Sequence, residues 1–154
     1  MLNVKKICFI ASSGGHFKQL TMLRELMDQF PSFVVTEEVK GAEVLGKQVY
    51  YLKQVNRKEG RCLLYMLQNT WRSMKILRKE KPDVVICTGV LATIPLCLMA
   101  KLLGKKLIYI ESFAKVNTGT LSGKLMYHIA DHFLVQWESM LKVYPKAVYK
   151  GGLY

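Results

Sequence analysis

The side chains that could do chemistry gather in three short polar motifs, each directly after an apolar run. These motifs are Ser12-Ser13-Gly14-Gly15-His16, Thr88-Gly89 and Glu111-Ser112. Backbone amides in a glycine-lined loop before a helix bind anions, so the first motif predicts a phosphate or diphosphate site. A neutral imidazole at His16, beside that loop, could accept a proton from an attacking hydroxyl. The pattern favours a phosphorylated ligand next to a general base.

Glu111 is the second candidate for a general base. A carboxylate at the end of a buried strand loses water, which favours uptake of a proton. Each candidate also has a plain structural interpretation. His16 could bond to its own loop as a helix-start residue, and Glu111 could be a solvated loop acid or a partner of Lys115. The residues alone leave these alternatives open.

Several enzyme motifs do not occur in the sequence. A dinucleotide fingerprint placed on Gly14 would need glycine where Ser12 and Phe17 stand, which argues against Glu37 as a ribose ligand. There is no P-loop lysine-serine pair and no G-x-S-x-G nucleophile elbow. The pair His128 and His132 lacks the zincin glutamate, and the four cysteines form no C-x-x-C pair. We therefore predict neither a metal site nor a cofactor.

Strand-like and helix-like patterns alternate along the chain and must position these motifs. The predicted strands are Lys5–Ala11, Phe33–Thr36, Gln48–Leu52, Asp83–Cys87, Lys106–Ile110, Phe133–Gln136 and Ala147–Tyr149. This alternation predicts one α/β domain over residues 1–154, with a Rossmann-like, doubly wound parallel sheet. Ligands of such sheets bind at the carboxyl ends of the strands, where the three motifs lie.

The helical segments are expected to cover both faces of this sheet. One helix is predicted from Phe17 to Met27, another from the cap Ser122 to Ala130, and a short one over Glu138–Tyr144. In the longest helix, the predicted inner face holds Leu63, Leu67, Trp71, Met74 and Leu77, and the outer face holds Gln68, Arg72, Lys75 and Lys79. The uncharged stretch 84–100 approaches membrane-span length, but Gly89 and Pro95 interrupt it and favour a buried helix.

The chain is strongly basic, and the excess charge is local. Of 23 basic and 11 acidic residues, nine basic residues and only two glutamates lie between Lys53 and Lys81, so this segment holds +7 of the net +12. Such a surface predicts an anionic partner. With no RNA-binding aromatic signature or helix-turn-helix spacing visible, a membrane surface is favoured over nucleic acid. The predicted membrane-surface residues are Arg61, Arg72, Lys75 and Lys79.

The three motifs, together with several other segments, resemble the asparagine-linked glycosylation 14-like family of oligosaccharide biosynthesis proteins. The additional segments are Tyr109-Ile110-Glu111-Ser112, Thr120-Leu121-Ser122-Gly123-Lys124, Val135-Gln136-Trp137 and Tyr144-Pro145-Lys146. The likeness spans nearly the whole chain and is strongest to bacterial members of the EpsE and CpsF type, which are encoded with exopolysaccharide and capsule genes.

The resemblance implies the N-terminal, acceptor-side half of a GT-B glycosyltransferase, with the donor half on a separate polypeptide. That partner would bind the UDP-sugar, while this chain, peripheral on the cytoplasmic face of the membrane, would hold a polyprenyl-diphosphate-linked acceptor. His16 and Glu111 become the catalytic candidates. The acceptor diphosphate would lie against Ser12, Ser13, Gly14, Gly15, Thr88, Gly89 and Ser112.

Two rival functions remain at this point. The chain could be a non-catalytic recruiter of a partner that holds the whole active site, or a cytosolic nucleotide-binding enzyme that acts alone. The sequence defines neither the sugars nor the linkage formed. Turnover by alanine variants of His16 and Glu111, with the partner supplied, separates the catalytic subunit from the recruiter. The third hypothesis predicts activity without membrane or partner.

Overall fold

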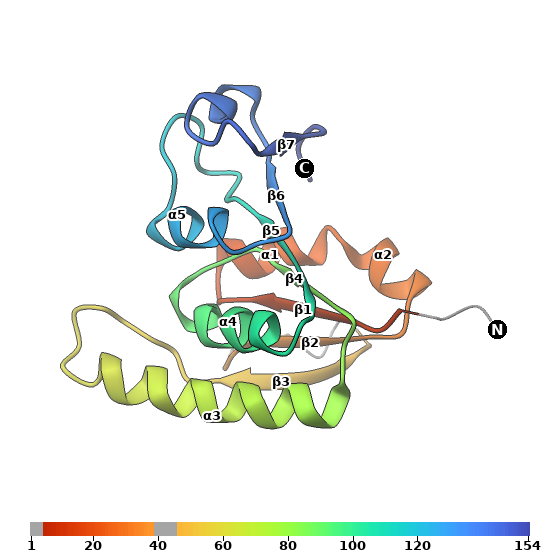
Figure 1. Ribbon diagram of the computed structural model, residues 1–154, viewed down its shortest axis with the longest axis vertical. Helices are drawn as coiled ribbons and strands as arrows, with labels where there is room; N and C mark the ends of the chain where they lie inside the picture. The colour runs from red at the N-terminus through yellow and green to blue at the C-terminus, as the bar shows by residue number, and fades with distance from the viewer. Residues whose placement is uncertain (1–4, 39–45) are drawn as a thin grey trace.

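A computed structural model describes residues 5–38 and 46–154, and its described strands form one parallel sheet of seven strands in the order β3-β2-β1-β4-β5-β6-β7 (Figure 1). The strands are β1 (Ile7–Ala11), β2 (Ser32–Glu37), β3 (Gln48–Leu52), β4 (Val84–Cys87), β5 (Lys106–Ile110), β6 (His132–Val135) and β7 (Val148–Tyr149). The predicted α/β, Rossmann-like class is confirmed. The strand order reverses beside β1, whose Ile7 pairs with Ser32 of β2 on one side and with Val84 of β4 on the other.

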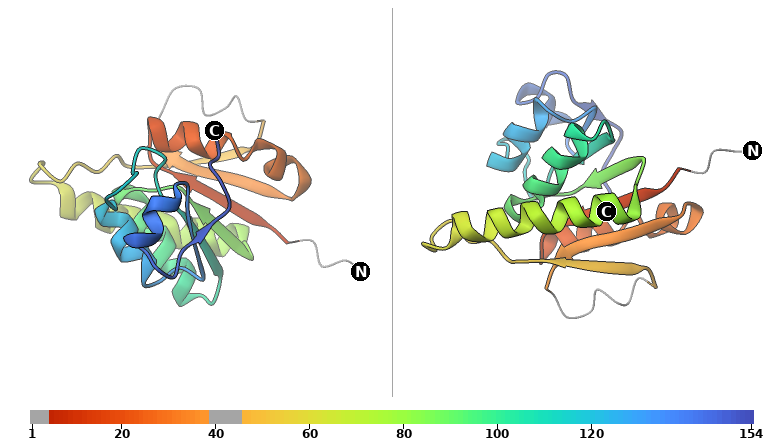
Figure 2. Two further views of the ribbon diagram at one scale, coloured as in Figure 1. Left: turned by 90° about the horizontal axis from the view of Figure 1, so that it is seen from above. Right: turned by 60° about the horizontal axis from the view of Figure 1, so that its bottom comes forward.

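Helices cover both faces of the sheet, as Figure 2 shows. They are α1 (Gly15–Thr21), α2 (Arg24–Gln29), α3 (Cys62–Glu80), α4 (Ile94–Leu102) and α5 (Leu121–Tyr127), with short 3₁₀ turns at Leu91–Thr93 and Glu138–Lys142. The central strand β1 is buried on both faces, and its side chains alternate between two cores. Cys8 and Ile10 face α3 and α4, whereas Phe9 packs toward Leu20 and Met27 of α1 and α2.

The predicted helix from Phe17 to Met27 is two helices in the structure. The N–H of Met22 donates to Gln19 O at 3.3 Å, and that of Leu23 donates to Leu20 O at 3.0 Å. These three-residue bonds tighten the last turn of α1, and α2 restarts at Arg24. Both short helices pack on the same core, through Leu20 of α1 and Met27 of α2.

The predictions for the two later helices also need correction. Thr120, and not Ser122, caps α5, because its Oγ1 accepts the N–H of Gly123 at 2.8 Å. The helix ends at Tyr127, three residues before the predicted end at Ala130. The segment predicted as a helix over Glu138–Tyr144 is a 3₁₀ turn.

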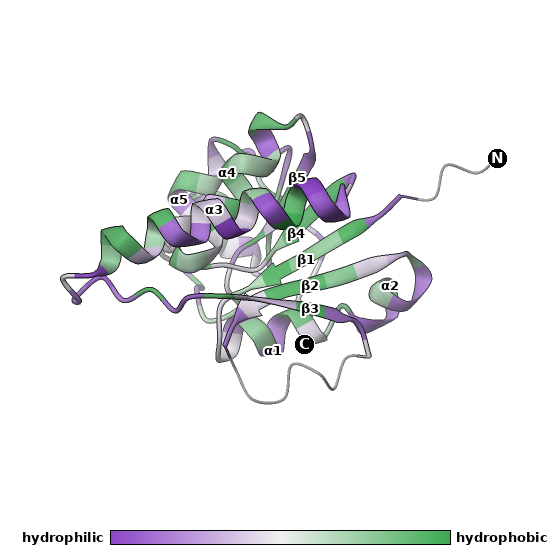
Figure 3. Cartoon of the chain, turned by 90° about the horizontal axis from the view of Figure 1, so that it is seen from below, coloured by the Kyte–Doolittle hydropathy of each residue, from purple (hydrophilic) through white to green (hydrophobic). Residues whose placement is uncertain are grey.

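The predicted orientation of α3 is wrong at its N-terminal half. Leu63 is 73% exposed, Leu67 61% and Trp71 63%, although the hydrophobic pattern placed them in the core. Leu77 is buried as predicted, but further toward the start of the helix it is Asn69 and Ser73 that face inward. Figure 3 shows hydrophobic residues on the first turns of α3, beyond the end of β3. We call the exposed residues Leu63, Leu64, Leu67 and Trp71 the α3 stripe.

Asn69 explains why a polar side chain takes the inner position. Its Oδ1 accepts the N–H of Lys53 at 2.8 Å, and its Nδ2 donates to the C=O of Lys53 at 2.8 Å. Lys53 directly follows the edge strand β3, so the amide satisfies backbone groups that lack a further strand. This pair fixes the rotation of α3 and turns the α3 stripe outward.

The uncharged stretch after β4 is packed inside the protein. Leu96, Cys97 and Ala100 of α4 have no exposed surface. Pro95 lies in the first turn of α4. A residue there has no helical partner for its N–H, so the missing N–H of proline costs no hydrogen bond. Within the described ranges, each helix is too short or too polar to cross a bilayer.

Replacing Asn69 tests its role in orienting α3. We expect Asn69→Ala to lower the free energy of unfolding by about 2 kcal/mol, because both backbone groups of Lys53 lose their partner. Thr70→Ala is the control, since its half-buried hydroxyl bonds only to the preceding turn, at Met66 O. Urea unfolding followed by circular dichroism measures both. Equal values for the two variants would show that the Asn69 pair does not determine the packing of α3.

Candidate functional site

The carboxyl ends of β1 and β4 lie side by side where the strand order reverses, and there the structure brings two of the three motifs together. The N–H of Ser12 donates to Gly89 O at 2.7 Å, and that of Thr88 donates to Ile10 O at 3.1 Å. Ser12, Thr88 and Gly89 are buried, whereas Gly14 and Gly15 are exposed. The buried residues thus form the back of the site, and the glycines form its open rim.

His16 is held by two reciprocal bonds to Thr88. The His16 Nδ1 lies 2.7 Å from Thr88 O, and the Thr88 hydroxyl donates to His16 O at 2.9 Å. A carbonyl oxygen only accepts, so the neutral ring must hold its proton on Nδ1. The Nε2 then has the lone pair, and no described residue bonds to it. The half-buried His16 is therefore oriented as a proton acceptor. The alternative in which its ring bonds to its own loop is wrong, because the ring bonds to Thr88 at the end of the neighbouring strand.

Gly89 is required by the close approach of two rings. Its φ is +102°, and a Cβ there would lie 3.2 Å from His16 Nδ1 and 3.2 Å from the Tyr109 hydroxyl. The Tyr109 hydroxyl is buried and has no hydrogen-bond partner among the described residues. Burial, with Cys87 and Glu111 nearby, raises the pKa of Tyr109 above its usual range, so it stays a neutral donor. The sequence analysis quoted Tyr109 only within a segment that carries the family resemblance and gave it no role, because an aromatic in an apolar strand looks like core.

The glycine loop after β1 is fixed by Glu37 at the end of β2. The Glu37 carboxylate accepts the N–H of Ser13 at 2.9 Å and the Ser13 hydroxyl at 2.7 Å. Gly14 follows with φ +73°, and the first helical bond of α1 runs from Lys18 N to Gly14 O. Ser13 therefore binds an internal carboxylate, and the N–H groups from Gly15 to Phe17 precede the first helical bond, so they have no acceptor within the helix. Glu37 therefore positions the glycine loop.

Glu111 lies at the end of β5 and is 1% exposed. One carboxylate oxygen accepts the N–H of Ser112 at 2.9 Å and the Thr120 hydroxyl at 3.0 Å. The other accepts the N–H of Thr120 at 3.2 Å and the Tyr144 hydroxyl at 2.9 Å. The interpretations of Glu111 as a solvated acid or a partner of Lys115 are wrong. We call this set of bonds the Glu111 network.

The Glu111 network is completed by two buried glutamines and a phenol, none of which the sequence analysis named as a site residue. Gln19 and Gln136 both donate to the Glu111 carbonyl, at 3.3 Å and 2.8 Å. Gln19 also accepts the N–H of Phe113 at 3.1 Å, which ties α1 to the segment after β5. Burial and the charge of Glu111 raise the pKa of Tyr144, so it remains a donor. Gln136 and Tyr144 had a sequence signal, because both lie in segments that carry the family resemblance, whereas the only signal for Gln19 is a polar residue within a predicted helix.

Ser112 belongs to the turn that follows β5. Its hydroxyl accepts the N–H of Ala114 at 3.3 Å, and its own N–H is bound to Glu111. The next ring, Phe113, packs against Trp137 and Tyr154, with ring centres 4.8 Å and 4.7 Å apart. Ser112 thus lies at the predicted edge, half-buried, as part of a folded turn.

The predicted membrane-surface residues lie on α3 or just before it, and they are exposed or half-buried. Arg72 donates to Tyr51 O at 3.3 Å, and the Lys75 ammonium lies 3.4 Å from the centre of the Trp71 ring. An open groove of about 250 Å³ runs between α3 and the edge strand β3. Its walls are Tyr50, Tyr51, Arg72, Lys75, Ile76 and Lys79.

Metal ligation finds no geometric support in residues 5–38 and 46–154, where no three His, Cys, Asp or Glu side chains gather. His128 follows the last residue of α5 and His132 begins β6, so the two do not share a helix face. All four cysteines are free thiols, and three of them, Cys8, Cys87 and Cys97, are buried.

Comparisons with known proteins agree with this architecture. Residues 35–153 match the family described as "Oligosaccharide biosynthesis protein Alg14 like". The human UDP-N-acetylglucosamine transferase subunit ALG14 is 30% identical over 177 residues, covering 96% of this chain and 82% of the human protein. A Pelagibacter ubique UDP-N-acetylglucosamine–N-acetylmuramyl-(pentapeptide) pyrophosphoryl-undecaprenol N-acetylglucosamine transferase is 30% identical over 118 residues, covering 71% of this chain and 33% of that enzyme.

Solved structures show the same fold at low sequence identity. Acinetobacter baumannii MurG superposes with a TM-score of 0.71 at 18% identity, covering 88% of this chain and 42% of MurG. A Rickettsia bellii UDP-N-acetylglucosamine 2-epimerase superposes with a TM-score of 0.74 at 16% identity, covering 98% of this chain and 46% of the epimerase. The chain therefore matches less than half the length of each of these solved structures.

Substitution of Gly89 tests whether its missing side chain positions His16. We expect Gly89→Ala to cost at least about 2 kcal/mol of stability, because strain at positive φ adds to contact with two rings. It should also shift the His16 imidazole resonances in a ¹⁵N spectrum. Gly104→Ala is the control: φ is +71° there, but no atom would lie within 4 Å of the new Cβ. An unchanged imidazole spectrum in Gly89→Ala would refute the positioning role.

Gly123 offers a test with an unusual sign. Glycine to alanine inside a helix ordinarily stabilises by roughly 0.5–1 kcal/mol. A Cβ at Gly123 would lie 2.0 Å from a Glu111 carboxylate oxygen, so we expect Gly123→Ala to destabilise by about 2 kcal/mol or more. Gly60→Ala, at a position with open space, is the control. Thermal unfolding compares them, and a more stable Gly123→Ala would mean that the Glu111 network yields easily.

Proposed function

The chain belongs to the Alg14-like family of oligosaccharide biosynthesis proteins, and we propose that it is the acceptor-side subunit of a two-chain glycosyltransferase. The observation that carries the proposal is His16, which presents an unbonded Nε2 at the open edge of a single lobe. Two-lobed enzymes of this fold are more than twice as long as this chain. A second polypeptide would supply the missing lobe and cover the edge.

We propose a lipid-linked acceptor and a UDP-sugar donor. The Pelagibacter relative is named for transfer of N-acetylglucosamine to a pyrophosphoryl-undecaprenol substrate, and the human relative for UDP-N-acetylglucosamine. Their likeness to this chain supports a polyprenyl-diphosphate-linked sugar as acceptor. A role in capsule or exopolysaccharide assembly is the setting we propose. The donor would bind mainly to the partner, in agreement with the small size of this lobe.

The geometry suggests how this lobe would promote an inverting transfer. His16 Nε2 would accept the proton of the acceptor hydroxyl while the hydroxyl oxygen attacks the anomeric carbon. The bond from that carbon to the nucleotide diphosphate breaks, and UDP leaves with the bonding electrons. The proton on His16 Nδ1 stays bound to Thr88 O, which orients the ring throughout. Exposed amides from Gly15 onward would bind the acceptor diphosphate, and the partner lobe would exclude water.

In this proposal Glu111 is a positioning residue and not a catalytic one. Its carboxylate is enclosed by Ser112, Thr120 and Tyr144, so the acceptor reaches it only if that network opens. The network holds the segment after β5 against α1, and α1 begins at the glycine loop. Glu111 would therefore shape the site from behind while His16 touches the substrate.

Attachment to the membrane is proposed to be peripheral, on the cytoplasmic face. Arg61, Lys75 and Lys79 are exposed, and Arg72 lines the groove beside them. Such a cluster is attracted to anionic lipid at about 1 kcal/mol per basic residue. The apolar stretch 90–103, which holds Lys101, contributes mainly to the core, so we assign the membrane contact to the α3 region and not to α4.

A second candidate is a non-catalytic recruiter of a complete partner enzyme. The enclosure of Glu111 favours this candidate, because it removes one of the two predicted bases from contact with substrate. Only His16 then has an atom, Nε2, that is available to accept a proton. The same partner and acceptor would then be bound without proton transfer. The two candidates differ in what happens when the His16 ring is removed.

The decisive experiment copurifies the chain with the protein encoded beside it and assays transfer from UDP-N-acetylglucosamine and other UDP-sugars to a polyprenyl-diphosphate acceptor. We expect His16→Ala to lower kcat at least about 100-fold, as loss of a general base does. His128→Ala, an exposed histidine away from the strand ends, is the control.

Three outcomes separate the hypotheses. Full turnover by the His16→Ala complex would leave the recruiter function in place and remove the catalytic one. Turnover by the solitary chain without its partner would contradict the two-chain proposal altogether. Loss of activity in the His128→Ala complex would show that the assay reports folding or assembly and not His16.

A further inference from the structure

We propose that α3 docks the protein on an anionic lipid bilayer by inserting the α3 stripe, so that the open edge of the sheet faces the membrane surface. This inference extends the proposed function and rests on it only for the purpose of docking, which is access to a lipid-linked acceptor. It goes beyond electrostatic attraction, because it places apolar side chains below the headgroups and fixes the orientation of the site.

The α3 stripe is an apolar surface without a partner. Leu64, Leu67 and Trp71 recur at intervals of three and four, so they lie on one face of the helix, and Leu63 lies beside them. All four are more than half exposed in the described structure. Single exposed leucines need no explanation, but a contiguous group of this size marks an interaction site. The Asn69 pair with Lys53 holds this face outward.

Basic residues continue the same face toward the end of α3. Lys75, Arg78 and Lys79 are exposed on the next two turns, and Arg61 immediately precedes the helix. The Lys75 ammonium over the Trp71 ring joins the apolar and basic parts. The outward face of α3 is therefore apolar over its first turns and cationic over its last ones. A helix with tryptophan and leucine beside lysine and arginine is suited to the interface of an anionic bilayer.

The composition of this face favours a bilayer over a protein partner. Centres of protein interfaces are depleted in lysine, whereas lysines 53, 75 and 79 line the grooves that border the α3 stripe. The only acidic residues between Lys53 and Lys81 are Glu59 and Glu80. Glu80 is bound by Lys6 and Tyr50 at the far end of the helix. Charge complementarity thus points to a phosphate-rich surface.

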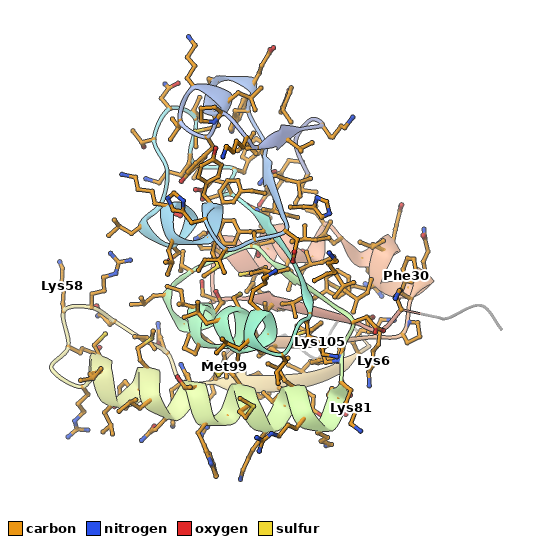
Figure 4. All side chains as sticks on the ribbon, viewed as in Figure 1. Lys6, Phe30, Lys58, Lys81, Met99 and Lys105 are labelled. Atoms are coloured by element: carbon orange, nitrogen blue, oxygen red, sulfur yellow. The ribbon has the colours of Figure 1, made fainter. Side chains whose placement is uncertain are left out.

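The topology determines which way the site would face. A helix that follows a parallel strand begins at the carboxyl edge of the sheet, so the first turns of α3 lie toward the edge that holds Gly14, Gly15 and His16. Figure 4 shows Lys58 at the tip of the loop before α3, extended away from the sheet on this side. Insertion of the α3 stripe would bring that edge close to the headgroups. A diphosphate anchored in the membrane could then reach the glycine loop.

The test uses the full chain alone, without partner or nucleotide sugar, in flotation with phosphatidylcholine vesicles that contain or lack phosphatidylglycerol. We expect binding to the anionic vesicles and roughly tenfold weaker partitioning for Leu67→Gln, because a leucine side chain is no longer buried in lipid. Leu102→Gln is the matched control, since Leu102 is 78% exposed on α4. We expect Lys75→Gln/Lys79→Gln to weaken binding by at least about tenfold, and Lys146→Gln/Lys150→Gln, with the same charge change, to do so much less.

Depth is measured by quenching of tryptophan fluorescence with brominated lipids. We expect quenching in the natural sequence and its loss in Trp71→Phe, which leaves Trp137 as the remaining tryptophan. Equal flotation of Leu67→Gln and Leu102→Gln, or unchanged quenching in Trp71→Phe, would overturn the proposal. So would self-association that Leu67→Gln abolishes in the absence of any vesicle binding, because the stripe would then be an interface between two copies. None of these readouts depends on sugar transfer, so they fail or succeed separately from the proposed activity.

Discussion

A carboxylate that is almost completely enclosed must receive hydrogen bonds on both oxygens, and Glu111 meets this requirement with donors from three segments of the chain. Thr120 supplies the start of α5, Tyr144 supplies the turn before β7, and Ser112 supplies the end of β5. Space for these donors exists because Gly119 and Gly123 have no side chain there. The whole region after β5 is therefore arranged around one charge. Through Gln19, the same residue also fixes α1, and with it the loop that holds His16.

His16 depends on a second constraint, which is the narrow space between β1 and β4. Thr88 can orient the imidazole because its carbonyl points at Nδ1 from the end of the neighbouring strand. Gly89 leaves room for the ring, and the Tyr109 hydroxyl also lies close to Gly89. Glu37 restrains the preceding serine from the other side. A single titratable ring is thus positioned by three strands, which gives a proton acceptor a fixed direction without an acidic partner.

The sequence was sufficient for the sheet and insufficient for the partners of its polar residues. Six predicted strands occur within one or two residues of their predicted bounds, and the last, Ala147–Tyr149, occurs as Val148–Tyr149, because buried parallel strands are written as unbroken apolar runs. The location of His16 and Glu111 at strand ends followed from the same pattern. Bonds between residues far apart in sequence, such as Glu37 with Ser13 or Tyr144 with Glu111, leave no periodic signal. The predicted orientation of α3 was wrong for a related reason. Periodicity shows that a helix has an apolar face, but the bond between Asn69 and Lys53 determines which face turns inward.

The position of β1 between β2 and β4 has a consequence for synthesis on the ribosome. The N-terminal strand finds its first neighbour within about thirty residues, but its second, Val84 of β4, lies 77 residues further along the chain than Ile7. Until that segment leaves the exit tunnel, one side of the most apolar strand has no backbone partner. While those 77 residues, half of the 154-residue chain, are synthesised, this edge of β1 is open to pairing with other chains, so we expect chaperones that bind exposed strands to protect it.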